Sequence, residues 1–221
     1  MDSRPNATHV VVAIDGPGAS GKSSTARALA KALGFLYVDT GAMYRTLAWY
    51  CLRKKVSLDS PRAIASACRR WKTSLENVSG QMRLLVEGKD PGDEIRTQEV
   101  GAAASKVAVV PAVRRWMRQT QRECRRFGNL VMEGRDIGTN VFPETDFKFF
   151  LDAPLEERAR RREAEGVSEN LRERDHRDSQ RAAAPLMVPL GAKVINNAGL
   201  TVEQTAELIV AEVKRRRAAA H

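Results

Sequence analysis

A glycine-rich segment near the N-terminus carries residues suited to binding a chain of phosphate groups. Residues 16–23 read Gly-Pro-Gly-Ala-Ser-Gly-Lys-Ser, which matches the phosphate-loop pattern GxxxxGK[ST] at every fixed position. Glycine lets the backbone curl so that successive N–H groups converge on one phosphate. The lysine can bridge the β- and γ-phosphates, and the following serine can bind Mg²⁺. The sequence therefore predicts a nucleoside triphosphate site, with Ser23 as its metal ligand, formed by Gly16, Pro17, Gly18, Ala19, Ser20, Gly21, Lys22, Ser23 and Ser24.

Three polar segments further along the chain carry groups suited to a second, phosphate-bearing substrate. They are residues 39–45, 133–136 and 174–181, and each contains arginine, whose planar fork matches a phosphate. Any one of these arginines alone fits a solvated salt-bridge surface equally well. Together, and after a phosphate loop, they favour an acceptor site. The candidate residues in these segments are Thr40, Tyr44, Arg45, Arg135, Asp136, Arg174, Asp178 and Arg181.

The elements that must position these residues alternate between strand and helix. Strands are predicted at 9–15, 35–39, 129–134, 147–152 and 192–196, from short β-branched or apolar runs that end at glycine or polar residues. Helices are predicted at 23–33, 40–53 (capped by Thr40), 61–71, 97–109, 111–127, 155–162 and 202–216, and a small hairpin is expected within 74–92. This alternation predicts an α/β fold with a parallel sheet covered by helices on both faces.

The composition is that of a globular protein with a basic surface. Of 221 residues, 43% are apolar and 29% are charged, which excludes global disorder. The net charge of +10 makes polyanions the partners to test, either a phosphate-bearing small molecule or a nucleic acid. The sequence has no apolar run long enough to cross a membrane. Three scattered cysteines suit neither a disulfide framework nor a zinc site, so we expect a cytoplasmic protein.

The rest of the chain narrows the class of phosphate-loop protein. No Asn-Lys dipeptide is present to read guanine, which argues against a GTPase, and no strand ends in Asp-Glu as in many motors and helicases. A small-molecule kinase remains, with its second substrate at the carboxyl ends of the strands. A nucleic-acid-binding ATPase is the alternative, because six arginines crowd the helix at 111–127 and the tail at 214–217 is basic. Aromatic residues total only 5%, which does not support a stacking platform for single strands.

At these residues the sequence resembles the bacterial cytidylate kinases, a family of nucleoside monophosphate kinases. The matching segments are IDGPGASGKSS at 14–24, DTGAMYR at 39–45, DEIRTQEV at 93–100, EGRDIGTNVFP at 133–143 and RDHRDSQRAAAPL at 174–186. The resemblance runs from about residue 9 to residue 213, and the first two segments together are highly specific.

The resemblance implies transfer of a phosphoryl group from ATP with Mg²⁺ to CMP or dCMP. Because no surface pattern indicates an obligate interface, we expect a monomer, and the low aromatic content leads us to expect no nucleic acid as partner. The resemblance also implies one phosphate-loop kinase domain over 1–221, with a core at 9–59, 97–157 and 182–217. A monophosphate-binding insert is expected at about 60–96 and a mobile lid at about 158–181. UMP or another small acceptor remains the alternative substrate.

The resemblance also implies roles for individual residues. Thr40, Arg114 and Asp136 are expected to face the cytosine, and Asp136 to accept a hydrogen bond from its exocyclic amine, which uracil lacks. Ser105, Arg174 and Asp178 are expected at the sugar, with Arg181 supporting Asp178, and Tyr44, Arg45 and Arg135 at the acceptor phosphate. The groups expected to stabilise direct in-line transfer are Lys22, Arg45, Arg135, Arg158 and Arg162.

Three segments depart from the family pattern, and one strand-end acid suggests a further role. The lid between Arg162 and Arg174 is short, residues 196–197 are both asparagine, and an amide stands at 140 in place of an apolar or small residue. The asparagine pair leaves the contacts to the ATP base undetermined. Glu133 is a further candidate, for holding a Mg²⁺-bound water.

Overall fold

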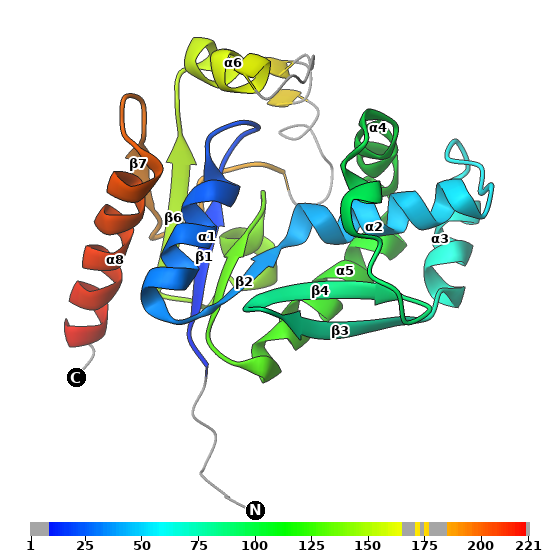
Figure 1. Ribbon diagram of the computed structural model, residues 1–221, viewed down its shortest axis with the longest axis horizontal. Coiled ribbons are helices and arrows are strands. Elements are labelled where there is room, and N and C mark those ends of the chain that lie inside the picture. Colours follow the sequence, from blue (N-terminus) through cyan, green and yellow to red (C-terminus); the bar gives the residue numbers. More distant parts are fainter. Residues whose placement is uncertain (1–8, 165–170, 173–174, 177–184, 220–221) are drawn as a thin grey trace, which may run out of the picture.

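The computed structural model describes residues 9–164, 171–172, 175–176 and 185–219. In this part of the chain, seven strands form one sheet in the order β3-β4-β2-β5-β1-β6-β7 (Figure 1). Neighbouring strands pair in parallel, except that β3 and β4 form an antiparallel hairpin. The strands are β1 (Val11–Asp15), β2 (Leu36–Asp39), β3 (Thr73–Val78), β4 (Gln81–Val86), β5 (Leu130–Glu133), β6 (Phe147–Asp152) and β7 (Lys193–Asn196).

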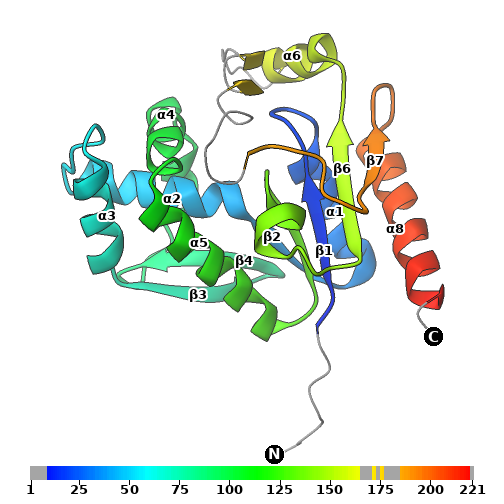
Figure 2. The same cartoon turned by 180° about the vertical axis from the view of Figure 1, so that it is seen from behind.

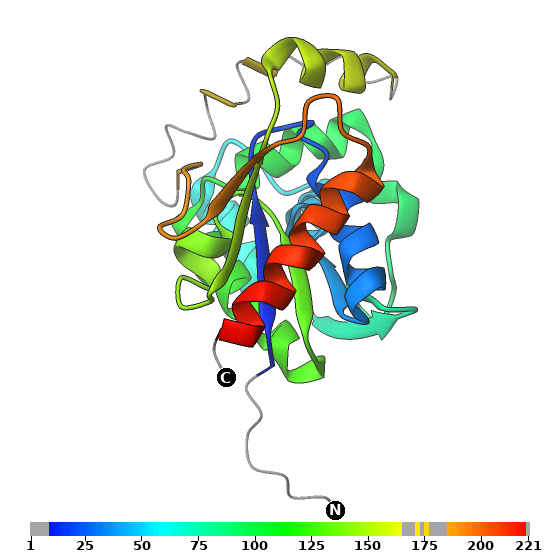
Figure 3. The same ribbon diagram turned by 90° about the vertical axis from the view of Figure 1, so that its left-hand side faces the viewer.

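Helices cover both faces of this sheet, as the alternation of elements predicts. α1 (Lys22–Leu33) and α8 (Val202–Ala219) pack on the near face in Figure 1, and α5 (Pro111–Glu123) lies on the opposite face, in front in Figure 2. α6 (Leu155–Ala164) crosses above the carboxyl ends of the strands, which is clearest in the side view of Figure 3. The remaining helical elements are α2 (Thr40–Arg53), α3 (Pro61–Arg70), α4 (Gln98–Val107), η1 (Gly92–Arg96), η2 (Cys124–Phe127) and η3 (Ile137–Val141).

The central strand β1 divides its side chains between two apolar cores. Val11 and Ala13 belong to the larger core, on the side of α5 and η3, whereas Val12 and Ile14 belong to the smaller one under α1 and α8. Successive side chains of a strand point to opposite faces, and a strand covered on both faces reads as a continuous apolar run. The apolar sequence of β1 is explained by this double burial.

The starts of three helices follow from local sequence. α1 begins directly after Gly21, whose φ of 81° only glycine adopts without strain. α2 is capped by the Asp39 side chain, which accepts a hydrogen bond from Ala42 N at 2.7 Å. The prediction that Thr40 caps this helix was therefore wrong, because Thr40 is its first residue. Thr97 caps α4 in the same way, accepting from Val100 N at 3.2 Å.

The hairpin predicted within 74–92 forms from β3 and β4, and it extends the central sheet. β4 pairs in parallel with β2 through Tyr37 and Gln81, so the segment expected as an insert continues the main sheet at one edge. Two short helical elements were not predicted. η1 is a 3-10 turn, and η3 is a π-type turn, in which the N–H of Phe142 donates to the carbonyl of Ile137, five residues earlier.

The three cysteines are free and buried in the larger core. Burial raises the pKa of the Cys51 thiol to about 11. It raises the pKa of Cys68 and of Cys124 to about 12. In the described chain these thiols act as small apolar side chains.

Candidate active site

Three neighbouring parallel strands end in acidic residues at one edge of the sheet. β1 ends in Asp15, β5 in Glu133 and β2 in Asp39, and the register pairs Glu133 with both Ile14 and Asp39. Asp15 follows the alternation of Val11 and Ala13 and therefore points to the side of η3. Glu133 follows Val131 and points to the side of α1. The alternation of side chains thus sends the carboxylates of Asp15 and Glu133 to opposite faces, whereas Asp39, the register partner of Glu133, shares the face of Glu133.

The predicted phosphate loop connects β1 to α1. Gly16 has φ 150°, and a β-carbon there would lie 2.1 Å from the carbonyl oxygen of Leu151, so the loop passes β6 only with glycine at this position. The buried Lys22 donates from Nζ to the carbonyl oxygen of Pro17 at 2.6 Å. The lysine therefore lies under the loop it is predicted to serve.

Ser23 and Glu133 form a pair of oxygen ligands beside this lysine. The Ser23 hydroxyl donates to Glu133 Oε1 at 2.7 Å. Burial, and secondarily the charge of Asp39, raise the pKa of Glu133, while Lys22 and the Ser23 hydrogen bond oppose this rise. A buried carboxylate and a hydroxyl are ligands that suit Mg²⁺, and a bound cation would offset the cost of burying the charge. These residues fit the metal that the sequence predicts.

Two of the predicted catalytic arginines bind the phosphate loop directly. Arg135 donates from Nη1 to the carbonyl oxygen of Gly16 at 2.7 Å. The buried Arg158, on α6, donates from Nη1 to the carbonyl oxygen of Gly18 at 3.0 Å. Asp175 accepts from Gly18 N at 3.2 Å and from Arg158 at 2.6 Å. A carboxylate thus already lies where a loop N–H and an arginine meet, so this position accepts an anion.

Asp136 and Arg114 form a buried ion pair near the loop. Arg114 on α5 donates from Nη2 to Asp136 Oδ2 at 2.6 Å, and the two side chains are 7% and 11% exposed. Asn140 donates from Nδ2 to the same oxygen at 3.0 Å. Within the described residues, Oδ1 of Asp136 receives no hydrogen bond. The unexpected amide at position 140 therefore helps to orient Asp136.

α2 brings Thr40 and Arg45 to the same edge. The Thr40 hydroxyl donates to the carbonyl oxygen of Glu133 at 2.7 Å, so it is engaged with β5. Arg45 donates from Nη2 to Asp39 Oδ2 at 3.1 Å, while its Nε is buried and has no partner in the described chain. Gly41 lies beneath this guanidinium, since a β-carbon there would be 3.3 Å from Arg45 Nη1.

Three further predicted residues lie on the helices α2, α4 and α6. Tyr44 lies on α2, Ser105 is half-buried on α4 and Arg162 is half-buried on α6. Within the described residues, Ser105 forms no hydrogen bond with the other substrate candidates. Three candidates lie outside the described residues: Arg174, Asp178 and Arg181.

Asn197, one of the two asparagines that depart from the family pattern, joins the loop to α6. It is 3% exposed and donates from Nδ2 to the carbonyl oxygen of Ser20 at 2.8 Å. Its own Oδ1 accepts from Arg161 Nη1 at 3.2 Å. The amide therefore links the loop to α6 through Arg161.

Sequence reasoning missed the supporting residues of the site. Asp39 and Asn140 bind the predicted residues Arg45 and Asp136, and Asn197 binds the loop. Arg161 binds Asn197, and Asp15 binds the two amides that follow Asp136. A polar residue at the end of an apolar strand was the available signal for Asp15 and Asp39. Asn140 had such a signal too, as an amide in a segment where an apolar residue was expected.

Elsewhere on the described surface, one hollow does not coincide with this site. It has a volume of about 480 Å³ and lies on α5, lined by Arg115, Arg118, Gln119, Arg122 and Glu123. The described residues contain no cluster of three or more histidine, cysteine or acidic residues that could bind a metal ion. No helix in the described part of the chain has the length and apolar character needed to cross a membrane.

The comparisons with known proteins agree with the geometry. The family model described as cytidylate kinase matches residues 12–215. A cytidylate kinase of Pelotomaculum thermopropionicum is 44% identical, with 96% of this chain and 97% of the relative covered. The cytidylate kinase of Caldanaerobacter subterraneus subsp. tengcongensis is 41% identical over 93% of this chain and 95% of its own. The cytidylate kinase of Klebsiella pneumoniae is 40% identical, with 89% of this chain and 92% of the relative covered.

Solved structures give a weaker similarity. The tunicamycin resistance protein of Deinococcus radiodurans covers 93% of this chain and 95% of its own with a TM-score of 0.48 and 19% identity. That similarity is too low to support a functional conclusion. The relation of this chain to the cytidylate kinases rests on the family model and the sequence matches.

Proposed function

Because this chain belongs to the cytidylate kinase family, we propose that it transfers the γ-phosphoryl group of ATP to CMP and dCMP, forming ADP and CDP or dCDP. One observation carries the proposal: Asp136, which forms a buried ion pair with Arg114, directly follows Arg135, which contacts the phosphate loop. A group able to recognise a base, Asp136, is therefore the next residue after a group able to bind the transferred phosphate, Arg135.

The donor half rests on the phosphate loop. Lys22, under the loop, is positively charged and donates to two neutral oxygens, Pro17 O and Ser20 Oγ. The N-terminus of α1 adds partial positive charge at the same place. We assign the triphosphate of ATP to this loop, and its transferred group to the position between Gly18 N and Arg158.

Mg²⁺ would be held by Ser23, with Glu133 beside it to accept hydrogen bonds from metal-bound water. When bound, the ion neutralises charge on the β- and γ-phosphates. The pair fits because the Ser23 hydroxyl and Glu133 Oε1 are 2.7 Å apart in a buried acidic environment.

The acceptor half rests on the arginines and carboxylates that follow β2 and β5. Asp136 Oδ1 is the acceptor left for the exocyclic amine of cytosine, and Arg114 and Asn140 hold the other oxygen. Uracil presents an oxygen there, which a carboxylate repels. Arg45, with a buried Nε that lacks a partner in the described chain, is assigned to the acceptor phosphate.

The chemistry we assign is a direct in-line displacement. An oxygen of the acceptor phosphate attacks the γ-phosphorus while the bond to the ADP oxygen breaks, so no phosphorylated enzyme forms. The residues that neutralise charge in the transition state are Lys22, Arg45, Arg135, Arg158 and Arg162. Inversion of configuration at phosphorus is expected, and retention would contradict the scheme.

The proposal also covers the lid, the insert, the cellular compartment and the oligomeric state. We propose that the segment 158–181 closes over both nucleotides, an assignment supported by the contacts of Arg158 and Asp175 with the loop. The segment 60–96 would contribute to the acceptor side. The buried free thiols fit a reducing compartment, so we assign the protein to the cytoplasm, as a monomer.

The test is a coupled ADP-release assay with ATP and Mg²⁺, offering CMP, dCMP, UMP, AMP and GMP separately. The wild-type protein should turn over CMP and dCMP, with UMP far behind. The Asp136→Asn variant should lose about 10- to 100-fold of its CMP-over-UMP preference, since an amide can pair with either base. Asp146→Asn, at an exposed position, is the control and should leave the preference unchanged.

Two outcomes would contradict parts of the proposal. An unchanged preference in Asp136→Asn would remove the assignment of Asp136 to the cytosine. ADP release that does not depend on any acceptor would indicate an ATPase, and it would direct attention to the basic hollow on α5 as a nucleic-acid surface.

A further inference from the structure

Asp15, the last residue of β1, forms two hydrogen bonds that the proposed mechanism does not use. Its side chain is fully buried, with 0% exposure. Oδ1 accepts from Ile137 N and Oδ2 accepts from Gly138 N, each at 2.7 Å. Each carboxylate oxygen thus binds a backbone N–H of a segment that is distant in the sequence.

These two N–H groups belong to the first residues of the π-type turn η3. The first N–H groups of such a turn have no carbonyl partner within it, and buried N–H groups need a partner. Asp15 supplies it because strand alternation points its side chain to this face. At Gly138 the approach is close: a β-carbon would lie 3.0 Å from Pro189 and 3.3 Å from Asp15 Oδ2.

The segment held in this way carries both groups that join the two halves of the site. Asp136 directly precedes η3, and its carbonyl oxygen accepts from Asn140 N and Val141 N. Arg135 precedes Asp136 and binds the carbonyl oxygen of Gly16, the residue next to Asp15. Two consecutive residues, one ending β1 and one opening the phosphate loop, therefore hold the 135–138 segment at both of its ends.

Stability alone does not account for a carboxylate at this position. Burial raises the pKa of Asp15 to about 7, with a smaller rise from Asp136, against the opposing effects of Gly138 N–H, Ile137 N–H and Lys22. Ionised, the group carries a desolvation cost that a neutral side chain would not. What an ionised carboxylate supplies in return is two acceptors at a fixed spacing, one for each N–H.

We propose that Asp15 is a positioning residue for substrate choice. By fixing the Ile137 and Gly138 amides, it sets where the Asp136 carboxylate stands relative to the phosphate loop. The inference rests on the proposed function, because it takes Asp136 to be the group that distinguishes cytosine from uracil.

The test compares Asp15→Asn with Asp152→Asn. The amide in Asp15→Asn would keep the shape of the side chain but offer one acceptor and one donor, so one N–H loses its partner. Asp152 is the matched control, since it ends the adjacent strand β6 but is exposed, and its side chain bonds only to Ala153 N among the described residues. The measurements are CMP, UMP and ATP affinities by calorimetry, kcat/KM for CMP and UMP, and thermal unfolding.

For Asp15→Asn we expect CMP affinity and the CMP-over-UMP ratio of kcat/KM to fall by about tenfold, as for one lost hydrogen bond to a charged group. ATP affinity should stay within about twofold, because the loop N–H groups are unchanged. Near pH 8 the variant avoids the cost of burying an ionised carboxylate but leaves one N–H unpaired, so thermal unfolding serves to separate a loss of selectivity from a loss of folding. A purely structural role predicts lower stability and an unchanged ratio.

The inference is overturned if Asp15→Asn has the wild-type affinities for CMP and UMP while Asp136→Asn has altered affinities for both nucleotides. If the wild-type protein does not use CMP at all, the proposed function fails instead, so the two failures are distinguishable. Should Asp15→Asn not fold, a second measurement uses the wild-type protein: the ratio of its CMP affinity to its UMP affinity between about pH 6 and pH 8. Because both ligands carry the same phosphate, titration of that phosphate cancels in the ratio. The ratio should fall as Asp15 gains a proton, and a flat ratio would overturn the inference.

Discussion

The donor and acceptor halves of the site hold their cations in different ways. In the donor half, Lys22, Arg135 and Arg158 each donate to a backbone carbonyl oxygen of the phosphate loop. In the acceptor half, Arg114 and Arg45 are paired with the carboxylates that stand beside them. Arg158 belongs to both patterns, since it also binds Asp175.

A carbonyl oxygen orients a cation without cancelling its charge, whereas a carboxylate does both. In the donor half the loop carbonyls orient three cations toward the place assigned to the triphosphate, whereas in the acceptor half two ion pairs keep the charge close to neutral until the substrate arrives. Substitutions in the donor half should reduce catalysis and leave the fold intact. Substitutions in the acceptor half should reduce both.

The largest effect is expected for Lys22→Ala. Loss of this cation should lower kcat by about 10³-fold or more, by analogy with the removal of other groups that stabilise transition-state charge. The free energy of unfolding should change by less than the activation free energy, since the charge that Lys22 stabilises develops mainly in the transition state. Steady-state kinetics and urea unfolding measure the two quantities. Lys31→Ala, exposed on the same helix, is the control, and an equal loss there would refute the assignment.

Arg114→Ala, in the acceptor half, should reduce stability as well as substrate binding. It leaves Asp136 buried without its charged partner, and breaking a buried pair in this way costs about 3–5 kcal/mol of unfolding free energy. Affinity for CMP should also fall. Arg115→Ala removes an exposed neighbour on α5 and should leave both unchanged. If Arg114→Ala is as stable as the wild type, the contrast between the halves is not real.

Ser23→Ala tests whether the Ser23 hydroxyl binds Mg²⁺ in the donor half. The concentration of Mg²⁺ needed for half-maximal rate should rise by about 10- to 100-fold, the usual cost of losing a residue that supports a metal site. CMP affinity should stay as in the wild type. Ser23→Thr keeps the hydroxyl and should restore the wild-type dependence; if it does not, the hydroxyl is not the ligand.

The smallest effect is expected for Asn197→Ala. It removes the hydrogen bond to the carbonyl oxygen of Ser20 and the one that Arg161 donates to Oδ1, and loss of the first, worth about 1 kcal/mol, should raise the KM for ATP by about fivefold. CMP parameters should not change. Asn196→Ala alters the exposed neighbour, and a similar rise in the KM for ATP there would argue against support of the loop by Asn197.

The same contrast explains how much of the molecule the sequence could predict. The phosphate loop is one contiguous segment between a strand and a helix, so its pattern is sufficient to predict its place. The α/β fold followed from the alternation of elements in the same way. Both were confirmed by the structure and the family match.

The acceptor half could not be predicted to the same depth, because its contacts join distant segments. The pairing of Asp15 with Ile137 and Gly138 spans 122 and 123 positions, and no local pattern encodes it. The π-type turn η3 depends on that pairing, since its first amides have no other carbonyl partner within the described chain. The capping of α2 was placed one residue late because Asp39 and Thr40 are both good capping residues.

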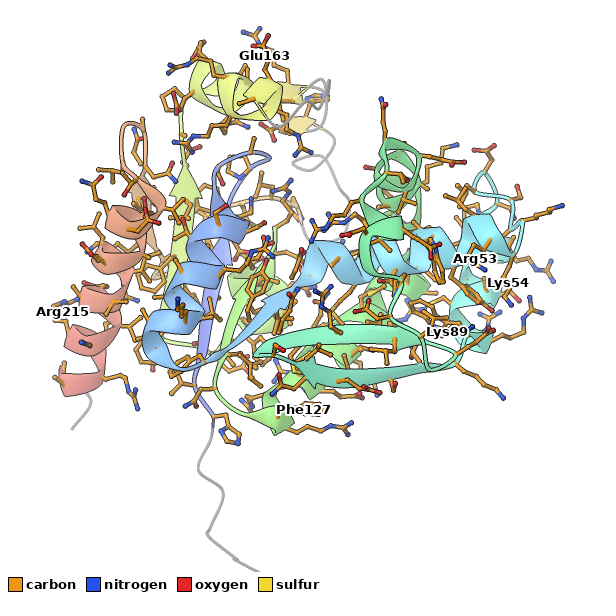
Figure 4. The ribbon with its side chains drawn as sticks, viewed as in Figure 1. Arg53, Lys54, Lys89, Phe127, Glu163 and Arg215 are labelled. Carbon is orange, nitrogen blue, oxygen red and sulfur yellow. The ribbon has the colours of Figure 1, made fainter. Side chains whose placement is uncertain are left out.

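The buried cysteines make the protein suitable for single-site labelling. Only the thiolate reacts with maleimides, and thiols with such raised pKa values are ionised to about one part in a thousand or less near pH 8. A fourth cysteine introduced by Glu163→Cys would lie at the outer surface of α6, where Figure 4 labels the glutamate. A fluorophore attached there would test the proposed closure of the lid in the wild-type cysteine background, without replacement of any native thiol.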